Sequence, residues 1–372
     1  MITQYPIRTI DLAVLRSNVR LLKESLPDGT RLMAVVKADA YGHGIVPAAR
    51  NALRAGASWL AVARTYEGIM LREAGIDAPI LVLGAASGLE IREGVRYRLT
   101  LTVTDPRMVH AVQRHAAAQE TQGDIHLKLD TGMGRIGVRT AEEVQEILAA
   151  MAECPAVRLT GVFTHFADAD GDDDAYTEQQ LERFNELSCP LPEGIIRHCA
   201  NSAAIHRYPE AAFDMVRAGI SMYGYPPVET AMPLRPVMDW RTAVTYVKQL
   251  QSGDKISYGC TYTTEKPIKV ATVACGYGDG YHRCASAKAE VIIQGVRCPV
   301  IGRICMDQMM VDVSAIEDAQ PGDEVILIGQ SGTEVITAND LGRWSDTISY
   351  EVLLAATERV HRKWINDDDE QA

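Results

Sequence analysis

The sequence predicts a (β/α)8 barrel followed by a smaller, mostly β domain, and three observations lead to this fold class. Eight short apolar segments alternate with stretches that suit helices over the first 220 residues. Polar residues follow the ends of these segments. After Gly224 this alternation gives way to proline-containing sequence and then to short β-branched segments bounded by turns. A chain of 372 residues is also longer than one hydrophobic core usually supports, so we expect two domains.

The first helix is expected directly after Asp11, where apolar residues recur at helical spacing until a Pro-Asp-Gly turn. The eight expected strands are residues 32–36, 59–62, 80–83, 99–103, 125–129, 159–164, 195–199 and 215–220. Helix-compatible stretches such as 141–151 separate most of them. Near-continuous apolar strands separated by helices indicate a parallel sheet that helices cover.

A closed barrel and a doubly wound open sheet both fit such a pattern, and the polar residues favour the barrel. In a barrel the residues just after each strand share one face, the mouth at which active sites lie. The candidates at these positions are Lys37, Lys128, Asp130, His165, Asn201, Ser202 and Arg217. We therefore expect a single site at this mouth.

The second domain is expected to be rich in β structure. Its predicted strands include 242–250, 270–274, 290–293 and 325–328, and its predicted helices are 338–344 and 351–361. The expected division is residues 1–10 packing with the C-terminal domain, 11–232 as the barrel and 233–372 as the β-rich domain. The acidic tail 367–370 is expected to fray.

Charge and composition exclude several classes of protein. A net charge of −12 disfavours binding to a phosphate backbone, so no nucleic-acid partner is expected. Eight cysteines without a C-x-x-C pair predict neither a zinc site nor a disulfide framework. The N-terminus lacks a signal-peptide pattern, and no apolar run approaches the length of a membrane helix. The chain is therefore expected to be soluble and cytoplasmic, with no membrane partner.

The most informative stretch is residues 33–44, M-A-V-V-K-A-D-A-Y-G-H-G. Lys37 follows four apolar residues, where desolvation would lower the pKa of its amine and make it a nucleophile for carbonyls. A lysine that merely extends to solvent from a strand end is the ordinary alternative. The adjacent Tyr41 and the two glycines suit the close approach of a ligand, which favours a functional lysine.

Residues 36–44, V-K-A-D-A-Y-G-H-G, resemble the signature of the alanine racemase family. Members use pyridoxal 5'-phosphate bound covalently to this lysine, and interconvert L-alanine and D-alanine with two catalytic bases. The resemblance therefore implies a cofactor-binding and catalytic role for Lys37, an amino acid substrate and a supply of D-alanine for bacterial peptidoglycan. It also implies a homodimer with shared active sites.

A second motif is K-L-D-T-G-M-G-R at residues 128–135. Asp-Thr-Gly also occurs in aspartic proteases, but a second such loop is missing, because Asp346-Thr347 continues with isoleucine. The resemblance implies that Arg135 faces the phenolic oxygen of the cofactor and the substrate carboxylate. Lys128 matches a lysine that is often carbamylated in the family and orients this arginine.

The resemblance assigns further barrel residues to the cofactor. His165 would pack near the pyridine ring, and Arg217, held by Asn201, would face the ring nitrogen. An arginine does not readily release a proton, so the ring nitrogen would stay unprotonated and side reactions would be suppressed. The cofactor phosphate would be bound by Ser202, Gly219, Ile220, Tyr41 and Tyr350.

The acidic residues between 168 and 174 include alternate carboxylates, as a calcium-binding EF-hand loop does. Counting from Asp168, the sixth position that requires glycine holds Asp173, and the twelfth that requires glutamate holds Gln179. A solvated loop with helix-capping acids is expected instead, and no metal site.

The β-rich domain carries the remaining candidates, again by resemblance. Tyr258 matches the second catalytic base, which the partner subunit supplies in the family. Because a phenol is a weak base near neutral pH, it would need cationic help, relayed from Arg217 through His165. Met306 and Asp307 match the loop beside the substrate carboxylate, and Tyr277, Arg303 and Cys305 match the entry corridor. One departure is His361, where proline is common.

Three rival functions share parts of this pattern. A serine-preferring racemase of the same fold tends to have asparagine where this chain has Tyr350. A non-catalytic pyridoxal phosphate carrier lacks the β domain that holds Tyr258 and Met306. A barrel-type decarboxylase would need a larger site of different construction. An alanine racemase is therefore the favoured interpretation.

Overall fold

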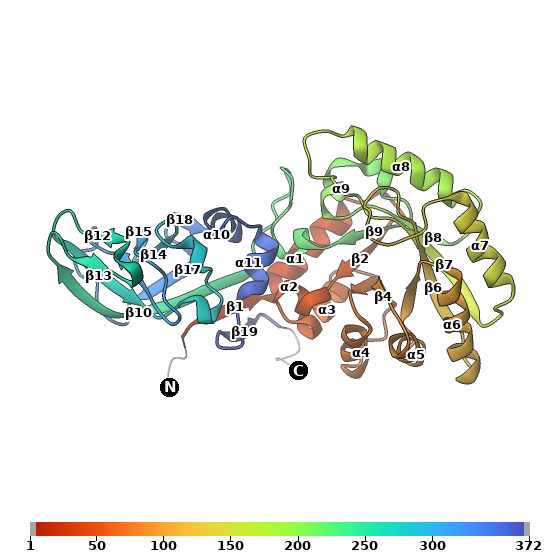
Figure 1. The fold of residues 1–372 in the computed structure, drawn as a ribbon, viewed down its shortest axis with the longest axis horizontal. Helices are drawn as coiled ribbons and strands as arrows, with labels where there is room; N and C mark the ends of the chain where they lie inside the picture. The colour runs from red at the N-terminus through yellow and green to blue at the C-terminus, as the bar shows by residue number, and fades with distance from the viewer. Residues whose placement is uncertain (1–4, 368–372) are drawn as a thin grey trace. The chain divides into compact units, whose positions relative to one another are not determined.

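The structure is a computed structural model that describes residues 5–367. The chain divides into two units, which we call the barrel unit (Leu15–Ala40 and Gly44–Arg235) and the β unit (Met1–Val14, Tyr41–His43 and Pro236–Ala372). The predicted fold class, a (β/α)8 barrel followed by a mostly β domain, is confirmed (Figure 1). The domain boundary near residue 233 stays a prediction.

Eight parallel strands form the sheet of the barrel unit in the order β8-β7-β6-β5-β4-β3-β2-β9. Their bounds are β2 (Arg31–Val35), β3 (Trp59–Val62), β4 (Ile80–Ala85), β5 (Thr100–Val103), β6 (Gly123–Lys128), β7 (Val157–Phe163), β8 (Ile196–His198) and β9 (Met215–Ala218). Two backbone hydrogen bonds span the remaining gap between β8 and β9, from Asp214 N to Arg197 O (3.1 Å) and from Arg217 N to Ala200 O (3.0 Å). The doubly wound alternative is thereby excluded.

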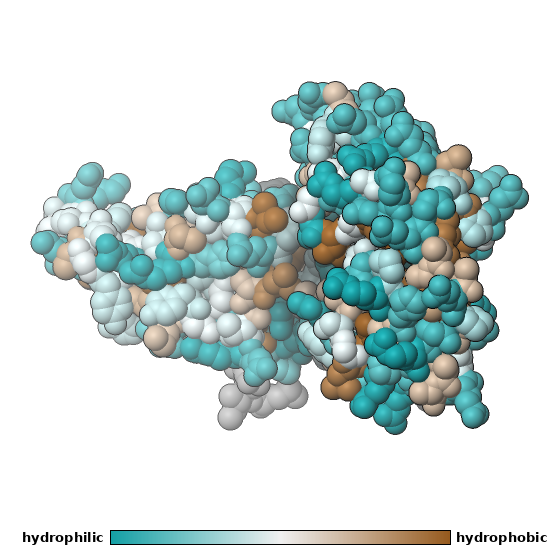
Figure 2. All heavy atoms as spheres, turned by 45° about the vertical axis from the view of Figure 1, so that its right-hand side comes forward, coloured by the Kyte–Doolittle hydropathy of each residue, from teal (hydrophilic) through white to brown (hydrophobic). Residues whose placement is uncertain are grey.

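Helices surround this sheet (Figure 1). They are α1 (Leu12–Glu24), α3 (Ile45–Arg54), α4 (Thr65–Glu73), α5 (Leu89–Arg96), α6 (Pro106–Ala118), α7 (Ala141–Ala152), α8 (Ala175–Ser188) and α9 (Ser202–Arg207), with the short 3-10 turns η1 (Pro209–Ala211) and η2 (Ile220–Tyr223). Local sequence explains several starts: Asp105 caps α6 ahead of Pro106, and Thr140 caps α7. Figure 2 shows hydrophilic residues over most of the visible outer face of this unit, with hydrophobic patches between them.

A nine-stranded sheet builds the β unit in the order β18-β17-β14-β15-β16-β13-β10-β1-β19. Its strands are β1 (Ile7–Asp11), β10 (Met238–Leu250), β13 (Ile268–Val273), β14 (Glu290–Ile293), β15 (Val296–Ile301), β16 (Met309–Asp312), β17 (Glu324–Ser331), β18 (Glu334–Ile336) and β19 (His361–Ile365). Two helices, α10 (Ala338–Ser345) and α11 (Ser349–Ala355), accompany it, with the strand pair β11 (Lys255–Ile256) and β12 (Tyr262–Thr263) and the 3-10 turns η3 (Tyr258–Cys260), η4 (Tyr277–Asp279) and η5 (Arg283–Ala285). The N-terminal strand β1 lies antiparallel to β10 and parallel to β19.

Two predicted elements are wrong at their C-terminal ends. The helix expected over 351–361 ends at Ala355. His361 instead begins strand β19, and the backbone N–H of His361 donates to Pro6 O (3.0 Å). The pairing partner of this strand lies more than 350 residues away at β1, which local sequence does not reveal. The strand expected over 215–220 ends at Ala218, because Ile220 begins η2. In the predicted N-terminal segment and acidic tail, residues 1–4 and 368–370 lie outside the described residues.

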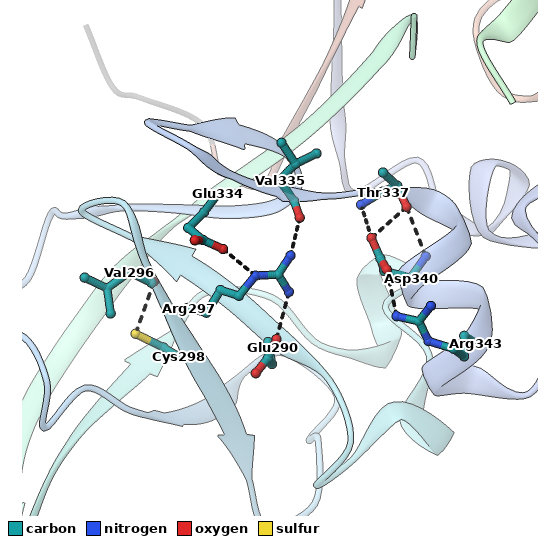
Figure 3. A network of polar contacts seen from close by, with 9 residues as sticks. All are labelled: Glu290, Val296, Arg297, Cys298, Glu334, Val335, Thr337, Asp340 and Arg343. Atoms are coloured by element: carbon teal, nitrogen blue, oxygen red, sulfur yellow. Dashed lines mark hydrogen bonds and ion pairs between the residues drawn. The ribbon is translucent and has the colours of Figure 1, made fainter. Parts of the chain in front are cut away.

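Arg297 on β15 joins three parts of the β unit (Figure 3). Its guanidinium pairs with Glu334 on β18 (2.6 Å) and Glu290 on β14 (2.8 Å), and it donates to the carbonyl of Val335. Both carboxylates help to raise the pKa of Arg297. Because one rigid fork serves all three partners, its contribution should exceed that of an isolated surface pair.

We predict that Arg297→Gln lowers the free energy of unfolding by about 1–2 kcal/mol, because it removes two ion pairs and leaves two carboxylates facing each other. Arg343→Gln is the control, since Arg343 forms one i,i+3 pair with Asp340 on α10 and should lower it by at most about 0.5 kcal/mol. Urea unfolding at low and high salt measures both. Equal losses for the two variants would contradict the bridging role.

Candidate active site

Lys37 leaves strand β2 through a left-handed turn, α2 (Lys37–Tyr41). Four consecutive non-glycine residues, 38–41, have φ between +52° and +54°. L-residues avoid this region because the Cβ atom approaches the backbone, at a cost of about 1–2 kcal/mol each. Strain of this kind persists where the surroundings fix it, and it gathers at functional sites.

The amine of Lys37 lies among cations. Burial lowers its pKa most, the positive charges of Arg135 and Arg217 lower it further, and the carboxylate of Glu67 opposes them. A lowered pKa increases the fraction of neutral, nucleophilic amine near neutral pH. This agrees with the direction expected from the sequence.

Arg217, at the end of β9, is buried with 4% of its surface exposed. Its Nη1 donates to the carbonyl of His198 (3.0 Å), and its Nη2 donates to the carbonyls of Thr164 and Cys199 (both 2.8 Å). The same two nitrogens contact His198 Nδ1 (3.0 Å) and His165 Nδ1 (3.2 Å). Burial lowers the pKa of Arg217 to about 10, so the group still carries its charge at neutral pH.

This buried charge acts on three neighbouring histidines. Burial and the charge of Arg217 hold the pKa of His165 and His198 well below the usual value, and lower that of His126 to about 3. His126 Nδ1 in turn lies 3.0 Å from His198 Nε2. The three imidazole rings are therefore neutral at pH 7. In each ring one nitrogen can donate a hydrogen bond and the other can accept one.

Two short turns meet beside Arg217. Ser202 at the start of α9 accepts hydrogen bonds through Oγ from Gly219 N (2.9 Å) and Ser221 N (3.4 Å). The start of η2, at Ile220, therefore lies next to the start of α9. Asn201 was expected to hold Arg217, but the structure shows other partners for both residues. Asn201 Oδ1 caps α9 by accepting from Ala204 N (3.0 Å), and backbone carbonyls hold the arginine.

Lys128, the last residue of β6, is almost completely buried. Its Nζ has no hydrogen-bond partner among residues 5–367 and lies 4.9 Å from the centre of the Phe163 ring. Burial and the charges of Arg217 and Arg135 hold its pKa well below the usual value. The following loop carries Arg135 on its exposed surface, and Asp130 Oδ1 accepts from Gly134 N (2.9 Å) within that loop.

In the β unit, the predicted phosphate ligands Tyr41 and Tyr350 lie together, with ring centres 6.0 Å apart. Burial and the neighbouring Tyr350 raise the pKa of the Tyr41 phenol, so it stays protonated. The next residue, Gly42, has φ +82°, and a Cβ there would meet Leu353 O at 2.4 Å. Only glycine fits at this point, because of the positive φ and the nearby backbone carbonyl.

The remaining candidates gather on neighbouring loops of the β unit. Tyr277 N donates to Cys305 O (3.0 Å), and Gly278 N donates to Met306 O (2.8 Å). Ser257, next to Tyr258, donates through Oγ to Arg303 O (2.5 Å). A Cβ at Gly276 would meet two carbonyls of the 305–306 segment at 2.3–2.4 Å. Close packing of the loops thus brings these candidates together.

Their side chains face solvent in this chain: Tyr258 is 69% exposed and Met306 52%. Arg359 bridges Asp307 (2.8 Å) and the buried Asp279 (3.2 Å), which fixes the end of the loop. Sequence reasoning did not single out Arg359 or Asp279. It also passed over Glu67 and His198 as chemistry-bearing residues, because only the fold shows that they lie beside Lys37 and Arg217.

The acidic stretch 168–174 behaves as a loop before a helix. Asp173 Oδ1 accepts from Ala175 N (2.9 Å) at the start of α8, and Asp174 pairs with Arg207. Within residues 5–367, no three His, Cys, Asp or Glu side chains are grouped to hold a metal ion. In the same range, no helix is long and apolar enough to cross a membrane.

The fold and the buried cations define a class of protein: a parallel barrel with a lysine of lowered pKa at its mouth, followed by a strained turn, and a β unit. The sequence matches the descriptions "Alanine racemase, N-terminal domain" over residues 10–227 and "Alanine racemase, C-terminal domain" over residues 237–364. The chain therefore belongs to the alanine racemase family, whose members are isomerases.

Relatives of known name match nearly the whole chain. An alanine racemase of Symbiobacterium thermophilum is 46% identical over 360 residues, which cover 95% of each chain. A crystal structure of alanine racemase from E. faecalis has a TM-score of 0.92 at 35% identity and covers 96% of this chain and 98% of its own. A Bacillus anthracis alanine racemase with bound L-Ala-P has a TM-score of 0.90 at 37% identity, with 99% and 96% covered.

The left-handed turn makes a stability prediction. Ala38→Gly should leave the free energy of unfolding unchanged or raise it by up to about 1 kcal/mol, because relief of about 1–2 kcal/mol of strain outweighs about 0.5–1 kcal/mol of lost backbone entropy. Ala117→Gly on the exposed side of α6 is the control and should lower it by about 1 kcal/mol. Thermal and urea unfolding compare them, and equal destabilisation would show that residue 38 is not strained.

Proposed function

We propose that this protein is an alanine racemase that interconverts L-alanine and D-alanine with pyridoxal 5'-phosphate. The observation that carries the proposal is Lys37, a lysine of lowered pKa held by a strained turn at the mouth of the barrel. Family membership supports the same reaction. On this proposal the enzyme works in the cytoplasm and supplies D-alanine for bacterial peptidoglycan.

The residues at the barrel mouth fit the cofactor. Lys37 offers an amine for the aldehyde, and Ser202, Gly219 and Ile220 offer a hydroxyl and turn N–H groups for the phosphate. Tyr41, whose phenol stays protonated, and Tyr350 would complete the phosphate site. When bound, pyridoxal phosphate supplies an electron-withdrawing ring that acidifies the Cα–H bond of an amino acid. Arg217, held rigidly by three carbonyls, would keep the ring nitrogen unprotonated.

Racemisation requires a proton acceptor on each face of the Cα atom. Lys37, whose pKa is lowered by burial and by the two arginines, would take or return the proton on one face. Tyr258 would serve the other face, and His165 would connect it to the charge of Arg217, since His165 Nδ1 lies 3.2 Å from Arg217 Nη2. His165, being neutral, can hold a hydrogen bond without adding a further charge.

Arg135 and Lys128 would bind the anionic parts of the site. Arg135 is proposed to face the cofactor phenolate and the substrate carboxylate. Lys128 is proposed to be an N6-carboxylysine, because carbamylation needs a neutral amine and burial holds the pKa of Lys128 well below its usual value. The carbamate would place a negative charge between Arg135 and Arg217, and would give the buried nitrogen the polar surroundings that it lacks.

The substrate side would be formed by the β unit. Met306 and Asp307 are proposed to lie beside the substrate carboxylate, and Tyr277, Arg303 and Cys305 to line the entry corridor. Tyr350 would restrict the space for larger side chains and so favour alanine over serine. Asparagine at this position would favour the serine-preferring alternative.

The exposure of large side chains supports a homodimer with shared sites. Tyr258 and Met306, which have proposed catalytic and binding roles, are 69% and 52% exposed in the single chain, and Ile348 is 61% exposed. A symmetric dimer in which each β unit covers the barrel mouth of its partner would bury them and supply the second base. No nucleic acid or membrane is expected to take part.

An assay of optical rotation tests the function. Purified protein with pyridoxal phosphate should abolish the rotation of L-alanine solutions, turning over L-serine more slowly and L-lysine not at all. Lys37→Ala should lower kcat/KM by about 10³-fold or more, because it removes the cofactor link and one base. A rate for L-serine above that for L-alanine would favour the serine-preferring alternative. Stable rotation of all three substrates would refute the racemase proposal.

A mixing experiment tests the shared sites. Lys37→Ala and Tyr258→Phe proteins are each expected to be inactive, whereas random exchange of subunits should restore about a quarter of wild-type activity. About half of the dimers are then mixed, and each mixed dimer has one intact site of two. Native mass spectrometry measures exchange independently. If exchange occurs and no activity returns, both bases come from one chain.

A further inference from the structure

Glu67 is a buried carboxylate with no role in the proposed chemistry. It lies in the first turn of α4 with 3% of its surface exposed. Its Oε2 accepts hydrogen bonds from Ala63 N (2.7 Å) and Arg64 N (2.9 Å), as expected for a glutamate that caps its own helix. Its Oε1 accepts from Ala38 N (2.6 Å), 29 residues earlier in the chain. This third bond serves no purpose for α4.

The third bond reaches the residue directly after Lys37. Ala38 is the first residue of the left-handed turn, in which four non-glycine residues hold unfavourable backbone angles. Bonds within the turn region, such as Ala40 N to Val36 O (2.9 Å) and Ile45 N to Asp39 Oδ1 (2.9 Å), close it locally. Glu67 adds a charged acceptor from the first turn of α4, and bonds to charged acceptors are about twice as strong as neutral ones.

Glu67 also has the opposite sign to the other charges around Lys37. Arg135 and Arg217 both lower the pKa of this lysine, and Glu67 raises it. His165, which faces Lys37 from the end of β7, is neutral because the surrounding cations hold its pKa down. Glu67 therefore offsets part of the repulsion that the two arginines exert on a protonated Lys37.

We propose that Glu67 is a positioning residue for Lys37: it holds the left-handed turn through the N–H of Ala38 and supplies a negative charge beside the segment of Lys37, opposite in sign to the two arginines. The proposal rests on the proposed function only for the identity of Lys37 as the reactive lysine. It assigns two tasks to this side chain: it must be long enough to accept the hydrogen bond from Ala38, and it must carry a negative charge. Two substitutions can separate these tasks. Glu67→Gln keeps the length and removes the charge, whereas Glu67→Asp keeps the charge and shortens the reach.

The chain offers a matched control in Glu143. This residue occupies the same position at the start of α7, where Oε2 accepts from Arg139 N and Thr140 N. Its hydrogen bonds within the described residues stay at its own helix start. Glu143→Gln and Glu143→Asp thus remove a capping glutamate without touching the segment of Lys37.

Two measurements on the full-length chain, freed of pyridoxal phosphate, test the proposal. The first is amide exchange of Ala38, which should speed up about tenfold or more in Glu67→Asp and in Glu67→Gln, because each variant loses the charged bond to this N–H. The second is the pH profile of Lys37 acylation by acetic anhydride, read by mass spectrometry. Its midpoint should fall in Glu67→Gln, and a fall of one unit raises the rate about tenfold at pH values below the midpoint. In Glu67→Asp the midpoint should move much less.

Both control variants should leave the Ala38 exchange and the Lys37 midpoint unchanged, whatever they do to stability. The proposal is overturned if the Glu67 variants match their Glu143 counterparts in both measurements, or if the Lys37 midpoint rises in Glu67→Gln. Neither measurement depends on turnover, so they stand apart from the proposed function. A shifted midpoint in a protein that does not racemise alanine would keep the role of Glu67 and refute the racemase.

Discussion

The structure of the barrel mouth depends on the burial of Arg217 without a carboxylate among its hydrogen-bond partners in the described chain. Three carbonyls and two histidines surround its guanidinium, and burial lowers its pKa only to about 10. Burial, and after it the charge of Arg217, lower the pKa of its neighbours His165, His198, His126 and Lys128. A site of this kind has an excess of positive charge and favours an anionic ligand.

The same excess of positive charge adds to the effect of burial in lowering the pKa of Lys37. In water an amine stays protonated at neutral pH, whereas at this mouth desolvation and two arginines favour the neutral form. The left-handed turn fixes where the amine emerges, and neighbouring loops of the barrel hold the turn. Strain in the backbone and repulsion between charges are thus both tolerated at one place because the surrounding barrel is rigid.

Much of this site could be predicted from the sequence. Lys37, Lys128, His165 and Arg217 each follow an apolar strand, and parallel strands deliver their C-terminal ends to one face, so their meeting follows from the fold class. Glu67 and His198 were missed as functional groups because a single glutamate at a helix start or a histidine in a strand has an ordinary structural explanation. The support of Arg217 was wrongly given to Asn201, because side-chain direction at a turn depends on which cap the residue forms.

The sequence by itself determined the barrel, the β-rich second part and the set of polar residues at strand ends, because hydrophobic periodicity and turn residues are local properties. Tertiary structure decided the features that depend on residues far apart in the sequence. Residues 361–365 form a strand because β1 offers a pairing edge, although the sequence predicts a helix that extends as far as residue 361. The lowered pKa of Lys128 and the hydrogen bond from Ala38 N to Glu67 likewise come from packing, since burial and proximity across 29 or more residues are not written in any one segment.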